Sequence, residues 1–131
     1  QADANLDMGD SAIMETGGLG AFAMAASPAL AKLGSAVGLG GTVQDSLDIT
    51  EQMYEITIGE NPGLPIPNLD FRGTPTGIDM LKVLETGIQP VINTSIAHKN
   101  PGIGQIGAGW ANPPMECFKK AFEAFAKKYQ G

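Results

Sequence analysis

The sequence predicts an α+β domain in which several helices pack on a small β-sheet or hairpin. Three features favour this fold class: segments with apolar residues at helical spacing, one alternating segment rich in β-branched residues, and proline- and glycine-rich stretches between them. The chain has 131 residues, 43% of them hydrophobic, which suits one domain with a real core. We therefore expect a single domain over residues 1–131.

The first expected helix lies in residues 11–33, a segment rich in alanine, glycine and methionine, in which Pro28 starts a new turn or divides the helix. The next helix is expected to begin at Thr42, which can cap it together with Asp45. Gly59 is placed to end this second helix. Its apolar positions follow at helical spacing: Val43, Leu47, Met53, Tyr54 and Ile58.

Residues 61–68 (NPGLPIPN) contain three prolines, which predicts an extended, edge-like segment. A short helix is expected after it, with Thr74 or Thr76 as its N-cap and Gly87 as its end.

Residues 89–97 (QPVINTSIA) are rich in β-branched side chains that alternate between two faces, which predicts a strand. Residues 103–108 could return as a second strand. The last helix is expected to begin at residues 112–113 and carries apolar side chains at alternating spacings of three and four. They are Met115, Phe118, Phe122, Phe125 and Tyr129. The lysines of this helix, Lys119, Lys120, Lys127 and Lys128, are most simply a solvated face.

Composition excludes several classes of protein. A formal net charge of −6 argues against a nucleic-acid partner, because the phosphate backbone needs a basic surface. One cysteine and one histidine cannot assemble a Cys/His zinc site, so no metal is expected. The spaced glycines of residues 102–109 do not open a helix, so no dinucleotide cofactor is expected either. The longest apolar stretch, residues 17–26, is shorter than the about 20 residues that span a bilayer. We expect a cytoplasmic protein without a membrane partner.

The first candidate site is the segment Arg72-Gly73-Thr74-Pro75-Thr76-Gly77, which holds the only arginine of the chain. A guanidinium grips carboxylate or phosphate through two parallel hydrogen bonds. Two hydroxyls and an expected helix start add further anion-binding groups. The alternative is structural: the threonines cap a helix, and Arg72 pairs with Asp70 or Asp79.

The second candidate site centres on His98, at the end of the expected strand 89–97. A histidine there could polarise a carbonyl or move a proton near neutral pH. Asn93 and Thr94 offer hydrogen-bonding groups on the same strand, and Gln105 could face a ligand from the next segment. The alternative is a surface histidine in a turn.

Five strings occur together in this order: GDSAIMETGGLGAFAMAASPAL, MYEITIGENP, LDFRGTPTGID, PVINTSIAHKNPGIGQIGAG and PPMECFKKAFEAF. They resemble the C-terminal part of the YlbE/YahG family of bacterial proteins, a family of unknown function. The likeness runs from Gly9 to Phe125. Members of this family are much longer, so with Gln1 in first place we expect the C-terminal fragment of a longer protein.

The resemblance implies a chemistry. YlbE-type members are associated with oxamate carbamoyltransferase, a multi-subunit enzyme of anaerobic allantoin breakdown that converts oxalurate and phosphate into oxamate and carbamoyl phosphate. Arg72, Thr74 and Thr76 would then hold a small anionic metabolite, and His98 with Gln105 would polarise the carbamoyl carbonyl. Companion enzyme subunits would be partners, and a homo-oligomer is left open. The alternative is a non-catalytic assembly or ligand-sensing subunit.

Overall fold

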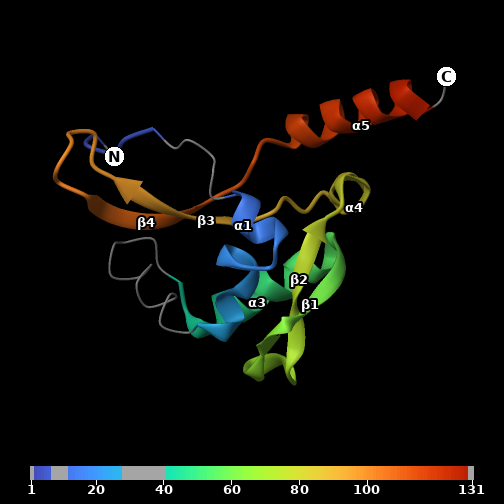
Figure 1. Cartoon of the computed structure of the whole chain (residues 1–131), viewed down its shortest axis with the longest axis horizontal. Helices are drawn as coiled ribbons and strands as arrows, with labels where there is room; N and C mark the ends of the chain where they lie inside the picture. The colour runs from blue at the N-terminus through green and yellow to red at the C-terminus, as the bar shows by residue number, and fades with distance from the viewer. Residues whose placement is uncertain (1, 7–11, 28–40, 130–131) are drawn as a thin grey trace.

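The computed structural model describes residues 2–6, 12–27 and 41–129, and these residues form an α+β fold (Figure 1). The predicted fold class is therefore confirmed. In chain order the elements are α1 (Ala12–Thr16), the 3₁₀ helix η1 (Gly20–Ala26), α3 (Val43–Glu55), β1 (Thr57–Ile66), the 3₁₀ helix η2 (Pro67–Leu69), β2 (Arg72–Ile78), α4 (Met80–Thr86), β3 (Ile92–Ala97), β4 (Gln105–Ala111) and α5 (Met115–Tyr129).

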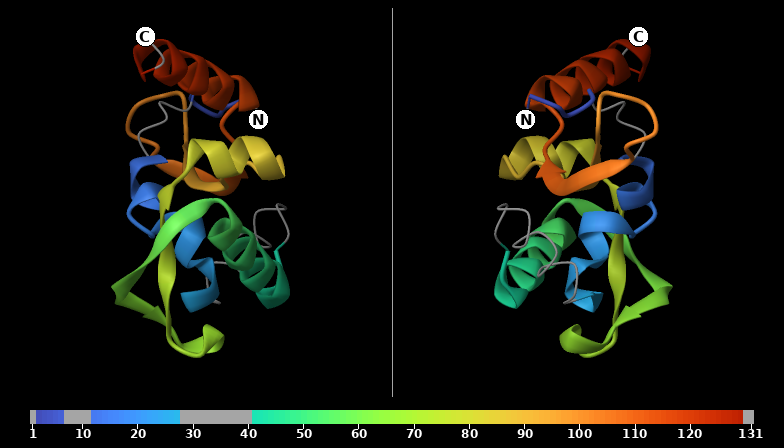
Figure 2. Two further views of the ribbon diagram at one scale, coloured as in Figure 1. Left: turned by 90° about the vertical axis from the view of Figure 1, so that its right-hand side faces the viewer. Right: turned by 90° about the vertical axis from the view of Figure 1, so that its left-hand side faces the viewer.

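The strands of the described residues form two separate antiparallel sheets of two strands each, β1 with β2 and β3 with β4. The predicted extended segment 61–68 is confirmed as far as Ile66, whereas Pro67 and Asn68 belong to η2. The register of β1 against β2 shifts between Asn61 and Pro65. The expected return strand is also confirmed, although β4 covers Gln105–Ala111 instead of residues 103–108. Figure 2 shows the β1–β2 hairpin and α5 at opposite ends of the molecule.

The hydrophobic core joins η1, α3 and α4. Phe22, Met53, Ile56 and Val83 are fully buried and pack together. Such small amphipathic elements gain stability from burying one apolar face against each other. The alanine-rich segment divides into the five-residue α1 and η1 instead of one long helix; η1 is largely buried, whereas α1 buries only Glu15. Pro28 and the rest of that expected helix lie outside the described residues.

The start of α3 matches the prediction. The Thr42 hydroxyl accepts a hydrogen bond from the backbone N–H of Asp45, and the Asp45 carboxylate accepts one from the N–H of Thr42. Its predicted end at Gly59 is wrong, because the helix stops at Glu55. The chain then enters β1, where pairing with β2 satisfies the backbone groups of residues from Thr57 onward.

The helix α4 has a different start from the one predicted. Its N-cap is Asp79, whose side chain accepts from the N–H of Leu81 at 2.8 Å. Thr74 and Thr76 are not helix caps, because the segment that contains them pairs with β1 as the strand β2. The predicted end is confirmed, since Gly87 adopts the left-handed conformation with φ of 72°.

The predicted last helix is confirmed as α5. Its first turn reaches the core, where Met115 and Phe118 pack against the buried cluster. None of its residues is buried. The described helices include none long and apolar enough to cross a bilayer.

Candidate functional site

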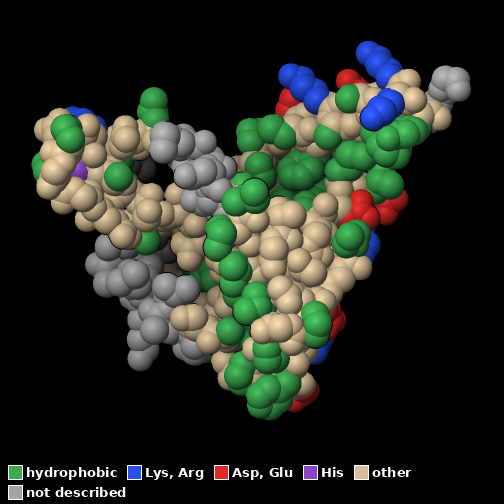
Figure 3. All heavy atoms as spheres, in the orientation of Figure 1, with side chains coloured by type: hydrophobic (Ala, Val, Ile, Leu, Met, Phe, Trp, Pro, Cys, Tyr) green, Lys and Arg blue, Asp and Glu red, His purple; other side chains and the backbone are tan. Residues whose placement is uncertain are grey.

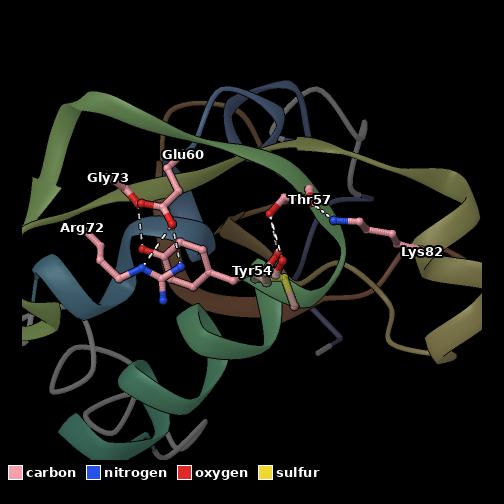
Figure 4. A network of polar contacts seen from close by, with 7 residues as sticks. Tyr54, Thr57, Glu60, Arg72, Gly73 and Lys82 are labelled. Atoms are coloured by element: carbon pink, nitrogen blue, oxygen red, sulfur yellow. Dashed lines mark hydrogen bonds and ion pairs between the residues drawn. The ribbon is translucent and has the colours of Figure 1, made fainter.

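Arg72 begins strand β2 and is held by an internal partner. Its Nε and Nη2 donate to the same Oε1 of Glu60 on β1, at 3.1 and 2.6 Å. The guanidinium carbon lies 3.8 Å from the centre of the Tyr54 ring on α3, a cation–π geometry (Figure 4). Tyr54 in turn donates its hydroxyl hydrogen to the carbonyl of Gly73 at 2.7 Å. The structural alternative correctly expected an internal ion pair for Arg72, but the partners that it named are wrong. The carboxylate that pairs with Arg72 is that of Glu60.

The surroundings favour the protonated forms of Arg72 and Tyr54. The hydrogen bond to Glu60 raises the pKa of Arg72 above its ordinary value. Burial raises the pKa of Tyr54, although the nearby Arg72 acts in the opposite direction. The cluster therefore contains a cation and a carboxylate that compensate each other, beside a neutral phenol.

An open pocket of about 190 Å³ lies against this cluster, lined by Tyr54, Thr57, Ile58, Gly59, Glu60 and Arg72. The carbonyl of Thr57, one of the lining residues, accepts a hydrogen bond from the Nζ of Lys82 at 2.6 Å (Figure 4). The pocket has room for a small anion, since one water occupies about 30 Å³ in the liquid. Such an anion would have to compete with Glu60 for the N–H groups of Arg72.

Thr74 and Thr76 attach β2 to the turn that follows α1. Thr74 is 1% exposed and packs against Gly18, where a Cβ would overlap its hydroxyl oxygen. The hydroxyl of Thr76 donates to the carbonyl of Thr16 at 2.9 Å. Both predicted anion-binding threonines thus contact backbone of the same chain.

His98 lies at the end of β3, on the other hairpin. Its Nδ1 accepts from the backbone N–H of Asn100 at 2.9 Å, and the backbone N–H of His98 donates to the carbonyl of Gly104 at 2.9 Å. Figure 3 shows this histidine, the only one in the chain, at the tip of the arm formed by β3 and β4. The side-chain amide of Gln105 donates to the carbonyl of Gly107 at 2.9 Å. The hydroxyl of Thr94 donates to the carbonyl of the next residue, Ser95, at 3.4 Å.

The two candidate sites are therefore not brought together in the described residues. Arg72, Thr74 and Thr76 belong to the β1–β2 sheet, whereas Gln105 belongs to the β3–β4 sheet and His98 directly follows β3. No hydrogen bond of the described chain links one group to the other, and the pocket beside Arg72 is lined from α3, β1 and β2 alone.

Sequence reasoning missed the group that connects these regions, Glu15. Its side chain is 1% exposed, and Oε1 accepts from the backbone N–H of Ala21 at 3.0 Å and of Asn93 at 2.9 Å. One carboxylate thus ties α1 to η1 and to β3. The glycines that follow it were the available signal, because a Cβ at Gly20 would overlap this same oxygen. Asn93, predicted to bind substrate, contributes its main chain to this contact.

No family model matches this chain. It is 52% identical over 127 residues to the uncharacterized protein YahG of Escherichia coli (strain K12), and 50% identical over 127 residues to the oxamate carbamoyltransferase subunit AllG of the same organism. Each match covers 97% of this chain, but 26% of YahG and 29% of AllG. The chain therefore spans less than a third of the length of these relatives.

A solved structure shows the same arrangement. The chain superposes with a TM-score of 0.86 on a conserved protein of unknown function from Enterococcus faecalis V583, at 60% sequence identity. The superposition covers 96% of this chain and 29% of that protein. The fold described above thus occurs inside a longer polypeptide in that organism.

Proposed function

We propose that this chain, which belongs to the YahG/AllG-type family over the region that it spans, forms part of a carbamoyltransferase subunit of the oxamate type. One observation carries this proposal: 50% identity to the subunit AllG over 97% of the chain. Identity at this level extends through both hairpins and their helices, so the module would keep the same place in the subunit.

We infer that the module acts there as a rigid platform and does not form a complete active site by itself. Internal contacts support this role: Glu60 holds Arg72, a backbone carbonyl holds Thr76, and His98 stands on the other hairpin. Transfer of a carbamoyl group needs anion-binding and carbonyl-polarising groups aimed at one point. Other regions of the subunit, or its companion subunits, would complete that arrangement.

A direct test replaces the matching 127 residues of AllG with this chain and combines the chimera with the companion subunits of the enzyme. The proposal predicts that the complex assembles and forms carbamoyl phosphate from oxalurate and phosphate. The matching region of YahG, transferred in the same way, is the control for a relative without an assigned activity. A chimera that assembles fully but has no activity would overturn the proposal.

The pocket beside Arg72 favours a second role for this region, the binding of a small anionic substrate. An exposed ion pair such as Arg72–Glu60 contributes only about 0–1 kcal/mol, so a phosphate or carboxylate could displace Glu60. Removal of the competing charge in Glu60→Gln should then raise the affinity for phosphate or oxamate. Calorimetric titration of the variant and of the unchanged chain tests this role. Equal affinities, or no binding by either protein, would exclude it.

A further inference from the structure

The helix α5 presents an apolar face that the described residues leave largely uncovered. Beyond its first turn, the side chains of Phe122, Phe125 and Tyr129 are 41%, 50% and 63% exposed. The rings of Phe125 and Tyr129 lie 4.7 Å apart, so the aromatic groups form one continuous stripe. Figure 3 shows hydrophobic side chains along the lower side of α5. A contiguous stripe of this kind on a soluble domain indicates a contact surface.

The charges of α5 are arranged about this stripe. At 100° per residue, Lys119 and Lys128 border it on its two sides, whereas Lys120 and Lys127 lie on the opposite side of the helix. Four of the seven lysines of an acidic chain are therefore on this one helix. The two lysines at the border would face the rim of any surface that covers the stripe, and an acidic rim would complement them.

The size of the stripe indicates what covers it. A fully buried aromatic side chain removes about 150–250 Å² from water, so three half-exposed ones offer roughly 300 Å². A stable interface between separate proteins buries about 800 Å² per partner. A stripe of this size is too small to hold two free molecules together. It is sufficient for a segment of the same polypeptide, because covalent connection replaces the loss of translational freedom on association.

The relatives contain such a segment. The matched region is 26% of YahG, 29% of AllG and 29% of the Enterococcus faecalis protein, so most of each polypeptide lies outside it. We propose that the apolar stripe of α5 docks into an apolar, acid-rimmed groove formed by the remaining polypeptide of a subunit of that length. This docking does not depend on carbamoyl transfer.

The test compares amide hydrogen exchange in the isolated chain with that in YahG carrying this chain in place of its matching 127 residues. Amides of α5 between residues 119 and 129 should exchange at least about tenfold more slowly in the long protein, because docking suppresses local opening. Phe125→Glu should return them to the rate of the isolated chain. The amides of α3 should keep their rates in both proteins, which shows that the variant is folded.

A matched pair of double variants tests the rim. Lys119→Glu with Lys128→Glu should abolish most of the added protection of α5 in the long protein. Lys120→Glu with Lys127→Glu makes the same change of charge on the opposite side and should leave the protection unchanged. Equal effects of the two double variants would refute the acidic rim.

If a second copy of the chain or a membrane covers the stripe of α5, other measurements will show it. A dimer of the isolated chain in light scattering, lost in Phe125→Glu, would assign the stripe to a second copy and overturn the proposal. Binding of the long protein to vesicles of phosphatidylcholine and phosphatidylglycerol, lost in the same variant, would assign it to a membrane surface. Equal exchange of α5 in the isolated chain and in the long protein would also overturn the proposal.

Discussion

Two nitrogens of Arg72 donate to a single oxygen of Glu60, across the β1–β2 hairpin and above the ring of Tyr54. The guanidinium is held by its ring and its carboxylate together, so its plane is fixed before any ligand arrives. This geometry gives Arg72 a structural function in the chain, whether or not an anion later replaces Glu60.

Arg72→Lys should lower the free energy of unfolding by about 0.5–1 kcal/mol, because an ammonium cannot stack on Tyr54 and donate twice to Glu60. Chemical denaturation measures this. Lys99→Gln is the control, since it removes a comparably exposed ion pair to Asp3 that has no aromatic partner, and it should cost less. An Arg72→Lys variant as stable as the unchanged chain would argue against the stacked arrangement.

Gly18→Ala should be strongly destabilising. Gly18 has φ of +84°, and an added Cβ would overlap the hydroxyl of buried Thr74 and approach the carbonyl of Pro75 to 3.1 Å. Gly102→Ala is the matched control, because Gly102 has φ of +86° and a Cβ added there would meet no atom of the described residues within 4 Å. The control should cost only the backbone strain of about 1 kcal/mol, and Gly18→Ala about 1–3 kcal/mol more.

The two glycine variants are compared by thermal or chemical unfolding under identical conditions. Equal losses of stability would show that only backbone conformation matters at Gly18, and that the close packing of the turn against β2 is absent.

Glu15→Ala should lower the free energy of unfolding by about 2–4 kcal/mol, since it leaves the buried N–H of Ala21 and the partly buried N–H of Asn93 without their acceptor. Glu15→Gln keeps an acceptor oxygen and should cost less. The exposed Glu116→Ala serves as a control and should stay within about 0.5 kcal/mol of the unchanged chain. Loss of stability in Glu15→Ala no greater than in this control would contradict the role of Glu15 as a connector.

Asp45 gives α3 a pH dependence of known sign. Hydrogen bonds from Thr42 hold the pKa of Asp45 below its ordinary value of 3.8, so the folded state binds this proton less tightly than the unfolded state does. The stabilisation is complete above about pH 3.8 and is lost as pH falls through the lower, folded pKa. Exchange of the first α3 amides between pH 5 and pH 2 should show this loss.

Asp45→Asn should remove that component of the pH dependence, whereas Asp48→Asn, which changes a carboxylate one turn later, should retain it. A profile that is unchanged in Asp45→Asn would show that the capping pair does not respond to acid.

Local signals account for the parts of the fold that the sequence predicted. The capping pair Thr42 and Asp45, the terminating Gly87 and the alternating residues of β3 each act within a few positions, so their consequences can be read in order along the chain. The predicted strand 89–97 is confirmed only from Ile92 to Ala97. Residues 72–78 look like a turn before a helix, because they contain two threonines, a proline and two glycines. Their strand conformation depends on β1, which pairs with them from earlier in the chain.

The candidate site likewise has features that the local sequence predicts and features that depend on distant parts of the chain. The sequence identified Arg72 as a residue that needs an anionic partner, but proximity in sequence suggested Asp70 or Asp79. Strand pairing instead brings Glu60 to it from twelve positions away. Likewise, the glycines after Glu15 indicate only its close packing against its own turn, whereas its contact with β3 comes from 78 positions away and has no local signal.

The rate of carbamoyl phosphate formation by the AllG chimera in its assembled complex decides whether this chain can serve as part of a carbamoyltransferase subunit. We expect a rate within about tenfold of that of intact AllG, which corresponds to a loss of at most about 1.4 kcal/mol in transition-state stabilisation. We also expect assembly with the companion subunits to be retained. A fully assembled complex that forms no carbamoyl phosphate would contradict the proposed place of this chain in a carbamoyltransferase subunit.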